Sequence, residues 1–324
     1  FILYHKTLAP KESITKTFNV HLADVYVSSE GGKVEDDVIN VSVSGRNAGL
    51  KSVSIKENEQ KGKTIWCMTD STGADQFTNV PYFGLQNYGG TGQVLSKYIN
   101  PEIAVSNQGE GGLDATDTVH FNNALEQMKS GDYLYIQYGF NDVKDKAVYK
   151  KRLEKYYTAA HEKGVKTILT SPTERQNTSA NWDGANKKWT ASNGIFAEAG
   201  KEFVDEKIAA GANDIAFVDV NMAFVNWMNE AMGTMLAQRN KAGFDDTEAS
   251  TRLMEYYFRI GWTFGRDSVH INEAGADNAG YLFAREAKKI IADNPSSVQA
   301  KVLSELMENS ADYTPVSYTH LTLP

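Results

Sequence analysis

The spacing of apolar residues changes near residue 60 of this chain. Residues 17–22, 38–43 and 52–55 alternate or cluster β-branched and aromatic side chains, and no helical period is present before residue 57. Three strands of this kind cannot enclose a core by themselves. We therefore expect residues 1–57 to form the last part of a β-sandwich whose beginning is missing.

From residue 63 onward, short apolar runs alternate with longer segments whose apolar residues recur every three or four positions. The expected strands are 64–68, 103–106, 132–138, 166–170 and 215–220, and the clearest expected helices are 147–163, 196–210 and 272–293. Such alternation predicts an α/β domain over residues 63–294, with a parallel sheet covered by helices on both faces. In sheets of this kind, ligands bind at the carboxyl ends of the strands.

The end of the chain is expected to lie outside this domain. Residues 295–315 are expected to form a C-terminal helical extension. Residues 316–321 resemble a translation of the transposase adapter GTC TCT TAT ACA CAT CT, so we expect residues 316–324, with His320, to be a sequencing-adapter artefact. At the other end no signal peptide is visible, and the chain begins at Phe1 in the manner of a fragment.

Composition narrows the possible partners. The 324 residues are 41% hydrophobic and 23% charged, with a formal net charge of −8. Nucleic acid is not expected as a partner, because phosphate binding needs a basic surface. A membrane span is not expected either, because no apolar run reaches about 20 residues.

Metal and disulfide sites are also not expected. Cys67 is the single cysteine, which excludes an intramolecular disulfide, and its position in an expected strand predicts a small core residue. Among the other histidines, His5, His21, His120 and His161 lack a spaced His or Cys partner for a metal.

Polar motifs follow the first three expected strands of the α/β domain, and a fourth precedes its last helix. They are Asp70-Ser71-Thr72-Gly73, Asn107-Gln108-Gly109-Glu110-Gly111-Gly112, Gly139-Phe140-Asn141-Asp142 and Asp267-Ser268-Val269-His270. The carboxyl ends of parallel strands open onto one edge of the sheet, and the loop before the last helix can reach the same edge. We therefore expect the four motifs to meet there.

The residue types in these motifs suit acyl transfer. A serine such as Ser71 becomes a nucleophile when an imidazole takes its proton, and His270 can supply that imidazole. Asp267 lies three residues earlier and can reach the Nδ1 atom of the ring, which fixes its tautomer. Asp70 is expected to anchor the serine loop through hydrogen bonds rather than to transfer protons.

Acyl transfer also needs donors for the oxyanion of the tetrahedral intermediate. The backbone N–H groups of Ser71 and Gly112 and the side-chain amide of Asn141 are the expected donors. Gly111 replaces Gly112 in this role if the loop is shifted by one residue. Asn141 could alternatively hold a turn.

In this order and spacing, the four motifs resemble blocks I, II, III and V of the SGNH (GDSL) hydrolases. The string over residues 64–76 is similar to the start of rhamnogalacturonan acetylesterase-type domains, which a β-sandwich of galactose-binding type can precede. The resemblance implies a three-layer, flavodoxin-like parallel sheet. It also implies a secreted or extracytoplasmic serine esterase that needs no metal or organic cofactor. Its substrate would be an acetyl or short acyl ester on plant cell-wall polysaccharide, such as pectin or xylan.

Two positions depart from the family pattern. Thr69 stands where glycine usually precedes the Asp-Ser pair, and its β-branched side chain is expected to alter the serine loop. Leu113 and Asp114 stand where pectin-type members often have Arg and Ser. Because Asp114 and Asp117 would repel a uronate, we expect neutral acetylated glycans to be deacetylated at least as well as acetylated galacturonan.

Three other functions fit the same residues. A lipase or thioesterase would differ in acyl-chain length, and a sugar O-acetyltransferase would differ in the acceptor of the acyl group. A glycan-binding protein with an inactive site is the non-enzymatic alternative. Trp182 and Trp189 flank a Gly/Asn-rich insertion, and one of them could stack on a sugar.

Overall fold

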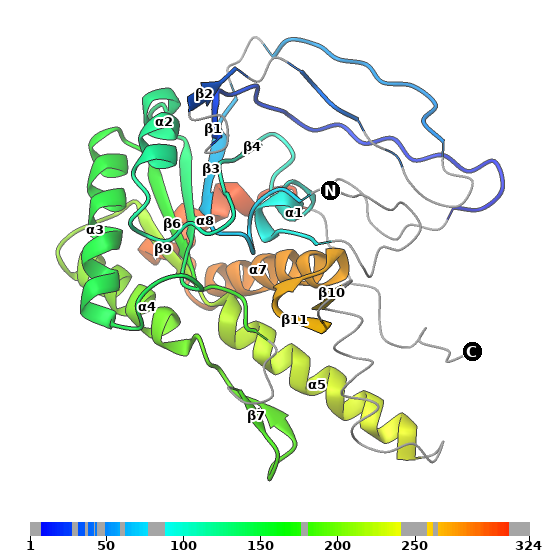
Figure 1. The fold of residues 1–324 in the computed structure, drawn as a ribbon. Coiled ribbons are helices and arrows are strands. Elements are labelled where there is room, and N and C mark those ends of the chain that lie inside the picture. The colour runs from blue at the N-terminus through cyan, green and yellow to red at the C-terminus, as the bar shows by residue number, and fades with distance from the viewer. Residues whose placement is uncertain are drawn as a thin grey trace.

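A parallel sheet runs through the middle of the protein (Figure 1). The computed structural model describes residues 8–27, 32–35, 38–41, 43, 49–58, 62–76, 88–175, 181–240, 258–261 and 265–310, without the side chains of 232, 234–240 and 258–268. Within these residues the sheet holds, in spatial order, β4 (Ala104–Asn107), β3 (Thr64–Thr69), β5 (Tyr133–Gln137), β6 (Lys166–Thr170) and β9 (Ile215–Val218). In chain order this is 2-1-3-4-5, the flavodoxin-like arrangement. The predicted fold class is confirmed.

The strands are short apolar runs because helices cover both of their faces. In β3, Ile65 and Cys67 belong to one hydrophobic cluster, while Trp66 and Met68 belong to the other. All four side chains are fully buried. Burial on both faces explains why the strand is continuously apolar rather than alternating. Cys67 is therefore the small core residue that was predicted, and burial raises the pKa of its thiol.

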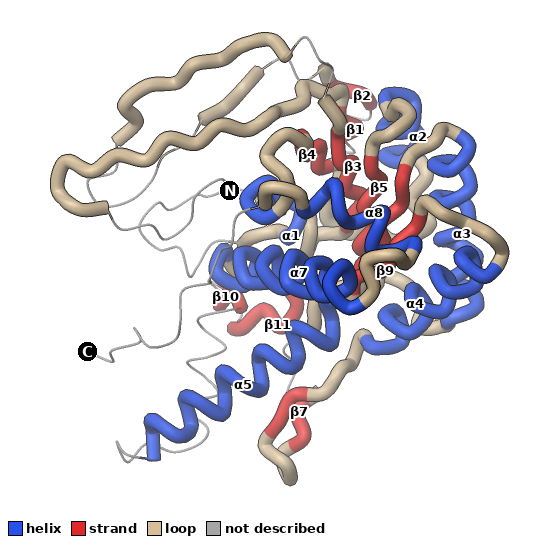
Figure 2. The backbone as a smooth tube through the Cα atoms, turned by 180° about the vertical axis from the view of Figure 1, so that it is seen from behind, coloured by secondary structure: helices blue, strands red, loops and turns tan. Residues whose placement is uncertain are grey.

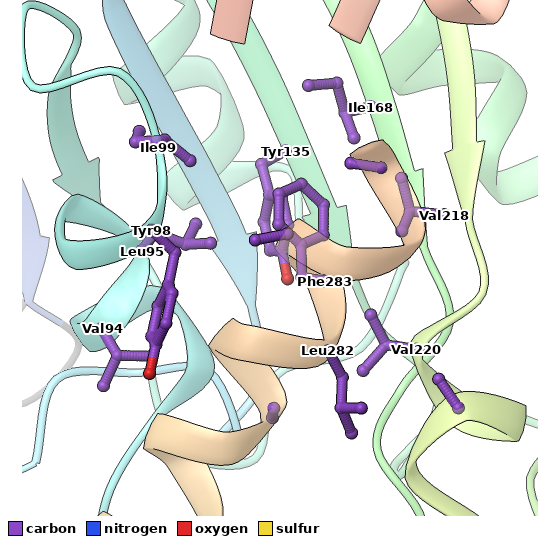
Figure 3. Packing of buried hydrophobic residues seen from close by; sticks show 14 of the residues in the cluster. Val94, Leu95, Tyr98, Ile99, Tyr135, Ile168, Val218, Val220, Leu282 and Phe283 are labelled. Atoms are coloured by element: carbon purple, nitrogen blue, oxygen red, sulfur yellow. The ribbon is translucent and has the colours of Figure 1, made fainter. Parts of the chain in front are cut away.

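One face of the sheet is covered by α1 (Thr91–Tyr98), α7 (Glu273–Asp293), α8 (Val298–Met307) and the start of α5 (Val220–Asn240). Figure 3 shows this packing, with side chains of α1 and α7 meeting those of the sheet. Asn272 caps α7, since its Oδ1 accepts a hydrogen bond from the Gly275 N–H at 2.9 Å. The last helix therefore starts where the sequence predicts.

The opposite face is covered by α2 (Val119–Gln127), α3 (Lys146–Glu162) and α4 (Gly194–Ala209), which lie together on one side of the sheet (Figure 2). Asp145 caps α3 by accepting a hydrogen bond from the Val148 N–H at 3.0 Å. The helices predicted at 147–163 and 196–210 are confirmed to within two residues at each end. The protein therefore has three layers.

The strands expected before residue 57 are wrong. Residues 17–22 and 52–55 carry no strand, nor does the described part of 38–43, and side chains such as Val20 and Ile55 are exposed. A short antiparallel hairpin, β1 (Val25–Val27) with β2 (Gly32–Val34), is present instead. A strand needs a neighbouring strand to pair its backbone hydrogen bonds, and within the described residues those segments pair with no strand. The Asn19 N–H donates instead to the Pro101 carbonyl at 2.9 Å. The division into a β-sandwich and an α/β domain stays a prediction.

Two further hairpins complete the described structure. The first joins β7 (Trp182–Asp183) to β8 (Lys188–Trp189), and the second joins β10 (Phe258–Gly261) to β11 (Gly265–Ile271). The segment before the last helix is thus a strand rather than the expected loop. Within the described residues, no helix combines the length and the apolar character that crossing a membrane requires.

A buried ion pair joins α1 to α7. The ammonium group of Lys97 contacts Asp277 Oδ1, which also accepts a hydrogen bond from the Tyr98 hydroxyl at 2.8 Å. The side chains of Lys97 and Asp277 are 2% and 5% exposed. Burial lowers the pKa of Lys97, and Asp277 opposes that change. Removing one partner of a buried ion pair destabilises the folded protein, because the other charge stays buried without compensation.

We predict that Lys97→Met lowers the free energy of unfolding by about 3–5 kcal/mol, because the buried carboxylate of Asp277 loses the cation that offsets its desolvation. Urea unfolding at neutral pH measures the change. Lys201→Met is the matched control, since Lys201 pairs with Asp205 on the exposed face of α4 and should contribute little. Equal losses in both variants would contradict a buried ion pair between α1 and α7.

Candidate active site

The serine loop begins directly after β3 and turns sharply. Asp70 is fully buried, and its Oδ1 accepts hydrogen bonds from the N–H of Thr72 at 2.9 Å and its hydroxyl at 2.7 Å. The Gly73 and Ala74 N–H groups both donate to the Asp70 carbonyl at 3.0 Å. The predicted anchoring role of Asp70 is confirmed. The turn leaves Ser71 half-buried at the carboxyl end of the strand.

Thr69 is buried at the base of the serine loop, and its effect on the shape of that loop stays a prediction. It ends β3 with extended backbone, where no positive φ is needed. Its side chain is buried against two glycines: a Cβ atom at Gly109 would lie 1.9 Å from Thr69 Oγ1, and one at Gly73 would lie 2.4 Å from Thr69 Cβ. The threonine is therefore accommodated because its neighbours in the first two motifs have no side chain.

His270 contacts Ser71, although the two residues are 199 positions apart in the sequence. Its Nε2 atom lies 2.7 Å from Ser71 Oγ, so the hydroxyl can donate its proton directly to the ring. The Tyr88 ring packs against the imidazole, with ring centroids 4.9 Å apart, and the Tyr88 backbone pairs with Asn272. The structure thus brings the first and fourth motifs together.

The backbone of β11 is irregular where the fourth motif lies. The pairs Phe258–Ile271 and Ile260–Arg266 are two residues apart on β10 but five apart on β11. Such a bulge redirects side chains, and bulges are frequent next to active sites. Asp267 belongs to this irregular stretch, but its side chain lies outside the described residues. Its pairing with His270 stays a prediction.

Of the two candidate glycines for the oxyanion, the structure places Gly111 next to Ser71. A Cβ atom at Gly111 would lie 4.0 Å from Ser71 Cβ, whereas one at Gly112, which has φ +84°, would meet nothing within 4 Å. Asn141 is exposed, and its amide nitrogen donates to the Leu113 carbonyl at 2.9 Å. An amide carries two N–H bonds, so the second can serve an oxyanion. Both glycines therefore stay candidates.

The repulsion of a uronate by Asp114 stays a prediction, and the structure places Arg152 of α3 beside this carboxylate. Arg152 Nη1 donates to Asp114 Oδ2 at 3.4 Å and to Asp142 Oδ1 at 2.6 Å. Asp142 also accepts from the Ala115 N–H at 3.2 Å. Asp117 points inward as well, toward α2. Arg152 carries one positive charge for the two carboxylates of Asp114 and Asp142, so these three groups keep a net charge of −1, and the Asp114 side chain is 25% exposed.

The two tryptophans of the insertion pack on each other. Trp182 and Trp189 face each other across β7 and β8, with ring centroids 4.9 Å apart. Trp189 is 2% exposed and belongs to the core. Trp182 is half-buried, so it is the one that could meet a sugar. Within the described residues, no group of three or more His, Cys, Asp or Glu side chains is placed to hold a metal.

Two of the groups that shape this site, Tyr88 and Arg152, gave no sequence signal, and the contact made by Gln76 was not predicted. Tyr88 and Arg152 stand in no recognised motif, and each reaches the site from an element distant in sequence. Gln76 donates its side-chain amide to the Ser71 carbonyl at 2.8 Å, which ties down the end of the serine loop. Only the folded chain shows these contacts.

Comparison with known proteins gives similarity at the level of solved structures. The YXIM protein from Bacillus subtilis shares 22% sequence identity over 71% of this chain, with a TM-score of 0.48, and the match spans 57% of the YXIM chain. Axe2, an acetylxylan esterase from Geobacillus stearothermophilus, shares 17% identity over 73% of this chain and 96% of its own, with a TM-score of 0.40.

A third solved structure is a carbohydrate esterase family 2 enzyme with a carbohydrate binding domain from Corynascus thermopiles. It shares 15% identity over 74% of this chain and 68% of its own, with a TM-score of 0.40. No protein family and no curated protein matches the sequence. We carry over neither activity nor substrate from these structures.

The sheet order and the placement of the motifs define the class of fold. Three motifs follow β3, β4 and β5 directly, and the fourth lies on β11 within reach of Ser71. With the 2-1-3-4-5 sheet, this is the three-layer, flavodoxin-like fold that the resemblance to SGNH hydrolases implies. The rhamnogalacturonan-type subgroup stays a prediction.

The buried carboxylate of Asp70 couples the serine loop to pH. Burial raises the pKa of Asp70 to about 6, although hydrogen bonds from Thr72 oppose part of that change. In the unfolded chain the pKa is near its ordinary value of about 4, so the folded protein binds more protons between about pH 4 and pH 6. The folded state therefore loses stability as the pH rises through this window and does not regain it above.

We predict that Asp70→Asn removes this loss. Between about pH 4 and pH 7.5, the free energy of unfolding of the variant relative to wild type should rise by about 3 kcal/mol, the equivalent of two pKa units. Urea unfolding at both pH values measures it. Asp205→Asn, on the exposed face of α4, is the control and should follow wild type. An unchanged difference for Asp70→Asn would mean that the buried carboxylate titrates normally.

Proposed function

We propose that this protein is a serine esterase that hydrolyses acetyl or other short acyl esters through an acyl-serine intermediate. The observation that carries the proposal is the 2.7 Å contact between Ser71 Oγ and His270 Nε2. A serine hydroxyl is a weak nucleophile until a neighbouring base accepts its proton. Here a half-buried imidazole lies at hydrogen-bond distance in the resting structure.

The proposed reaction has two steps. Ser71 Oγ attacks the ester carbonyl carbon while its proton moves to His270 Nε2, and the imidazolium then protonates the leaving alcohol as the acyl-serine forms. In the second step, His270 takes a proton from water, the hydroxide attacks the acyl-serine, and the carboxylic acid leaves as Ser71 recovers its proton. Asp267 is proposed to hold the ring tautomer and stabilise the imidazolium.

The oxyanion of each tetrahedral intermediate is proposed to lie between the Ser71 loop and the glycine loop. The backbone N–H groups of Ser71 and of Gly112 or Gly111 would donate to it, together with the free N–H of Asn141. Each such donor is worth roughly 3 kcal/mol in the transition state. The reaction as written uses residues of this chain and water, so we propose that it needs no metal or organic cofactor.

The proposed substrate is an acetylated polysaccharide or oligosaccharide of the plant cell wall, met by a secreted or extracytoplasmic protein. This proposal rests on the resemblance of residues 64–76 to rhamnogalacturonan acetylesterase-type domains. Arg152 offsets only one of the two negative charges of Asp114 and Asp142, so neutral acetylated glycans should be deacetylated at least as well as acetylated galacturonan. Acetylated xylan and acetylated pectin are the candidate substrates to compare.

The first prediction of this proposal concerns the relay. Ser71→Ala and His270→Ala should each lower kcat by roughly 10⁴-fold or more, because the nucleophile or its base is lost. Asp267→Asn should leave a small remnant of activity, because the imidazole remains but its orientation is lost. Hydrolysis of p-nitrophenyl acetate measures the three rates.

Labelling with a fluorophosphonate tests the same residue without a substrate. Wild type should be labelled and Ser71→Ala should not, while Ser304→Ala on the remote helix α8 serves as the control and should be labelled normally. Absence of labelling in folded wild type would favour an inactive glycan-binding protein. Wild-type turnover by Ser71→Ala would exclude the proposed mechanism.

A second prediction concerns the acyl and alcohol groups. We expect kcat/KM to be far higher for p-nitrophenyl acetate than for p-nitrophenyl octanoate. We also expect EDTA to leave the rate unchanged, because the proposed reaction uses no metal. On acetylated polymers, Asp114→Asn should raise the rate on galacturonan relative to xylan, because it removes a negative charge that Arg152, shared with Asp142, does not offset. Acetate release measures both. A rate that increases with acyl length would favour a lipase or thioesterase instead.

A further inference from the structure

A buried histidine outside the proposed relay holds the glycine loop. His120 of α2 has a side chain that is 3% exposed, and both of its ring nitrogens face carboxylates. Nε2 lies 2.8 Å from Glu110 Oε2, and Nδ1 lies 3.0 Å from Asp117 Oδ1. Glu110 belongs to the glycine loop, whereas Asp117 precedes α2. His120 therefore links the loop to the helix.

The two contacts require a charged ring. An ionised carboxylate oxygen only accepts hydrogen bonds, so each ring nitrogen of His120 must carry a proton. Burial disfavours the imidazolium, but the hydrogen bonds and charges of Asp117 and Glu110 outweigh burial and raise the pKa of His120. The ring is therefore held as an imidazolium between two carboxylates.

The other described groups around His120 contact its ring face or its neighbours rather than its two nitrogens. The Tyr26 ring of β1 meets the imidazole edge-on, with centroids 5.0 Å apart. The Tyr156 hydroxyl of α3 donates to the Asp117 carbonyl. The other titratable or charged groups on the elements packed here are Asp24, Lys33, Asp114, Glu126, Tyr138 and Arg152. The carboxylates of Asp117 and Glu110 remain the groups that contact the ring nitrogens.

The position of Glu110 gives the link its consequence. It stands between Gly109, which packs against Thr69, and Gly111, whose Cβ position is 4.0 Å from Ser71 Cβ. Glycine has no side chain, so no side-chain contact holds its backbone in place. The neighbouring Glu110 side chain therefore provides the anchor that limits how Gly111 and Gly112 turn their N–H groups beside Ser71.

We propose that His120 is a positioning residue, whose imidazolium ties Glu110 to α2 and thereby holds the Gly111–Gly112 backbone in place beside the serine. When His120 loses the proton on Nε2, that nitrogen presents a lone pair to Glu110 Oε2, and the hydrogen bond between them is lost. The glycine loop then loosens, and its donors no longer converge on the oxyanion. The catalytic part of this proposal rests on the proposed esterase function.

The first test is the pH profile of kcat for p-nitrophenyl acetate. Wild type should lose activity about tenfold as the pH rises through the pKa of His120, the size of one hydrogen bond to a charged group. In Glu110→Gln this alkaline loss should disappear, because the neutral amide can donate to the unprotonated ring. Glu126→Gln, at the exposed end of α2, is the matched control and should keep the wild-type profile. An alkaline loss that persists in Glu110→Gln overturns the proposal.

The second test does not depend on catalysis. In Ser71→Ala, ¹⁵N spectra should show the Gly111 and Gly112 amide resonances shifting with the same midpoint as the His120 ring nitrogens, and Glu110→Gln in that background should abolish the coupling. Amide resonances that ignore the His120 titration overturn the link. If these resonances titrate together but wild type has no esterase activity, the link between His120 and the glycine loop is supported and the esterase function is rejected.

Discussion

The hydrogen bond between Ser71 and His270 is the interaction around which the described structure is organised. It joins residues that are 199 positions apart, one after β3 and the other on β11. To form it, the sheet must place the end of β3 at its carboxyl edge, and the segment before α7 must cross back over that edge. The packing of α1 against α7 and the cap at Asn272 set where that segment lies. A contact of 2.7 Å therefore depends on the whole three-layer arrangement.

A second constraint is steric. The loops after β3 and β4 approach so closely that side chains at Gly73 and Gly109 would overlap Thr69. The buried Thr69 side chain fills the space between the two loops. Its backbone is ordinary extended strand, so the threonine fits there because the glycines on either side have no side chain.

The ion pairs around the site join its loops to each other and to the neighbouring helices. Arg152 connects Asp114 to Asp142, and His120 connects Glu110 to Asp117. In each case a cation from a helix on one face of the sheet lies between two carboxylates from the loops above it. Such pairs are favourable only when the buried charges are well matched. Each cation offsets one of its two carboxylates, so each group of three keeps a net negative charge.

The sequence by itself determined the class of fold and predicted that Ser71 and His270 would meet. Apolar runs within 64–68 and 215–220 become buried parallel strands, because both faces are covered, and three of the four motifs follow strands at the edge where a sheet gathers chemistry. Sequence failed where an outcome depends on partners distant in the chain. The apolar alternation at 17–22 and 52–55 does not produce strands without a neighbouring strand, and the charge of Asp114 could not be judged without Arg152. Only the tertiary structure decided these points, because hydrogen-bond pairing and charge neutralisation depend on distances in space, which residue spacing along the chain does not give.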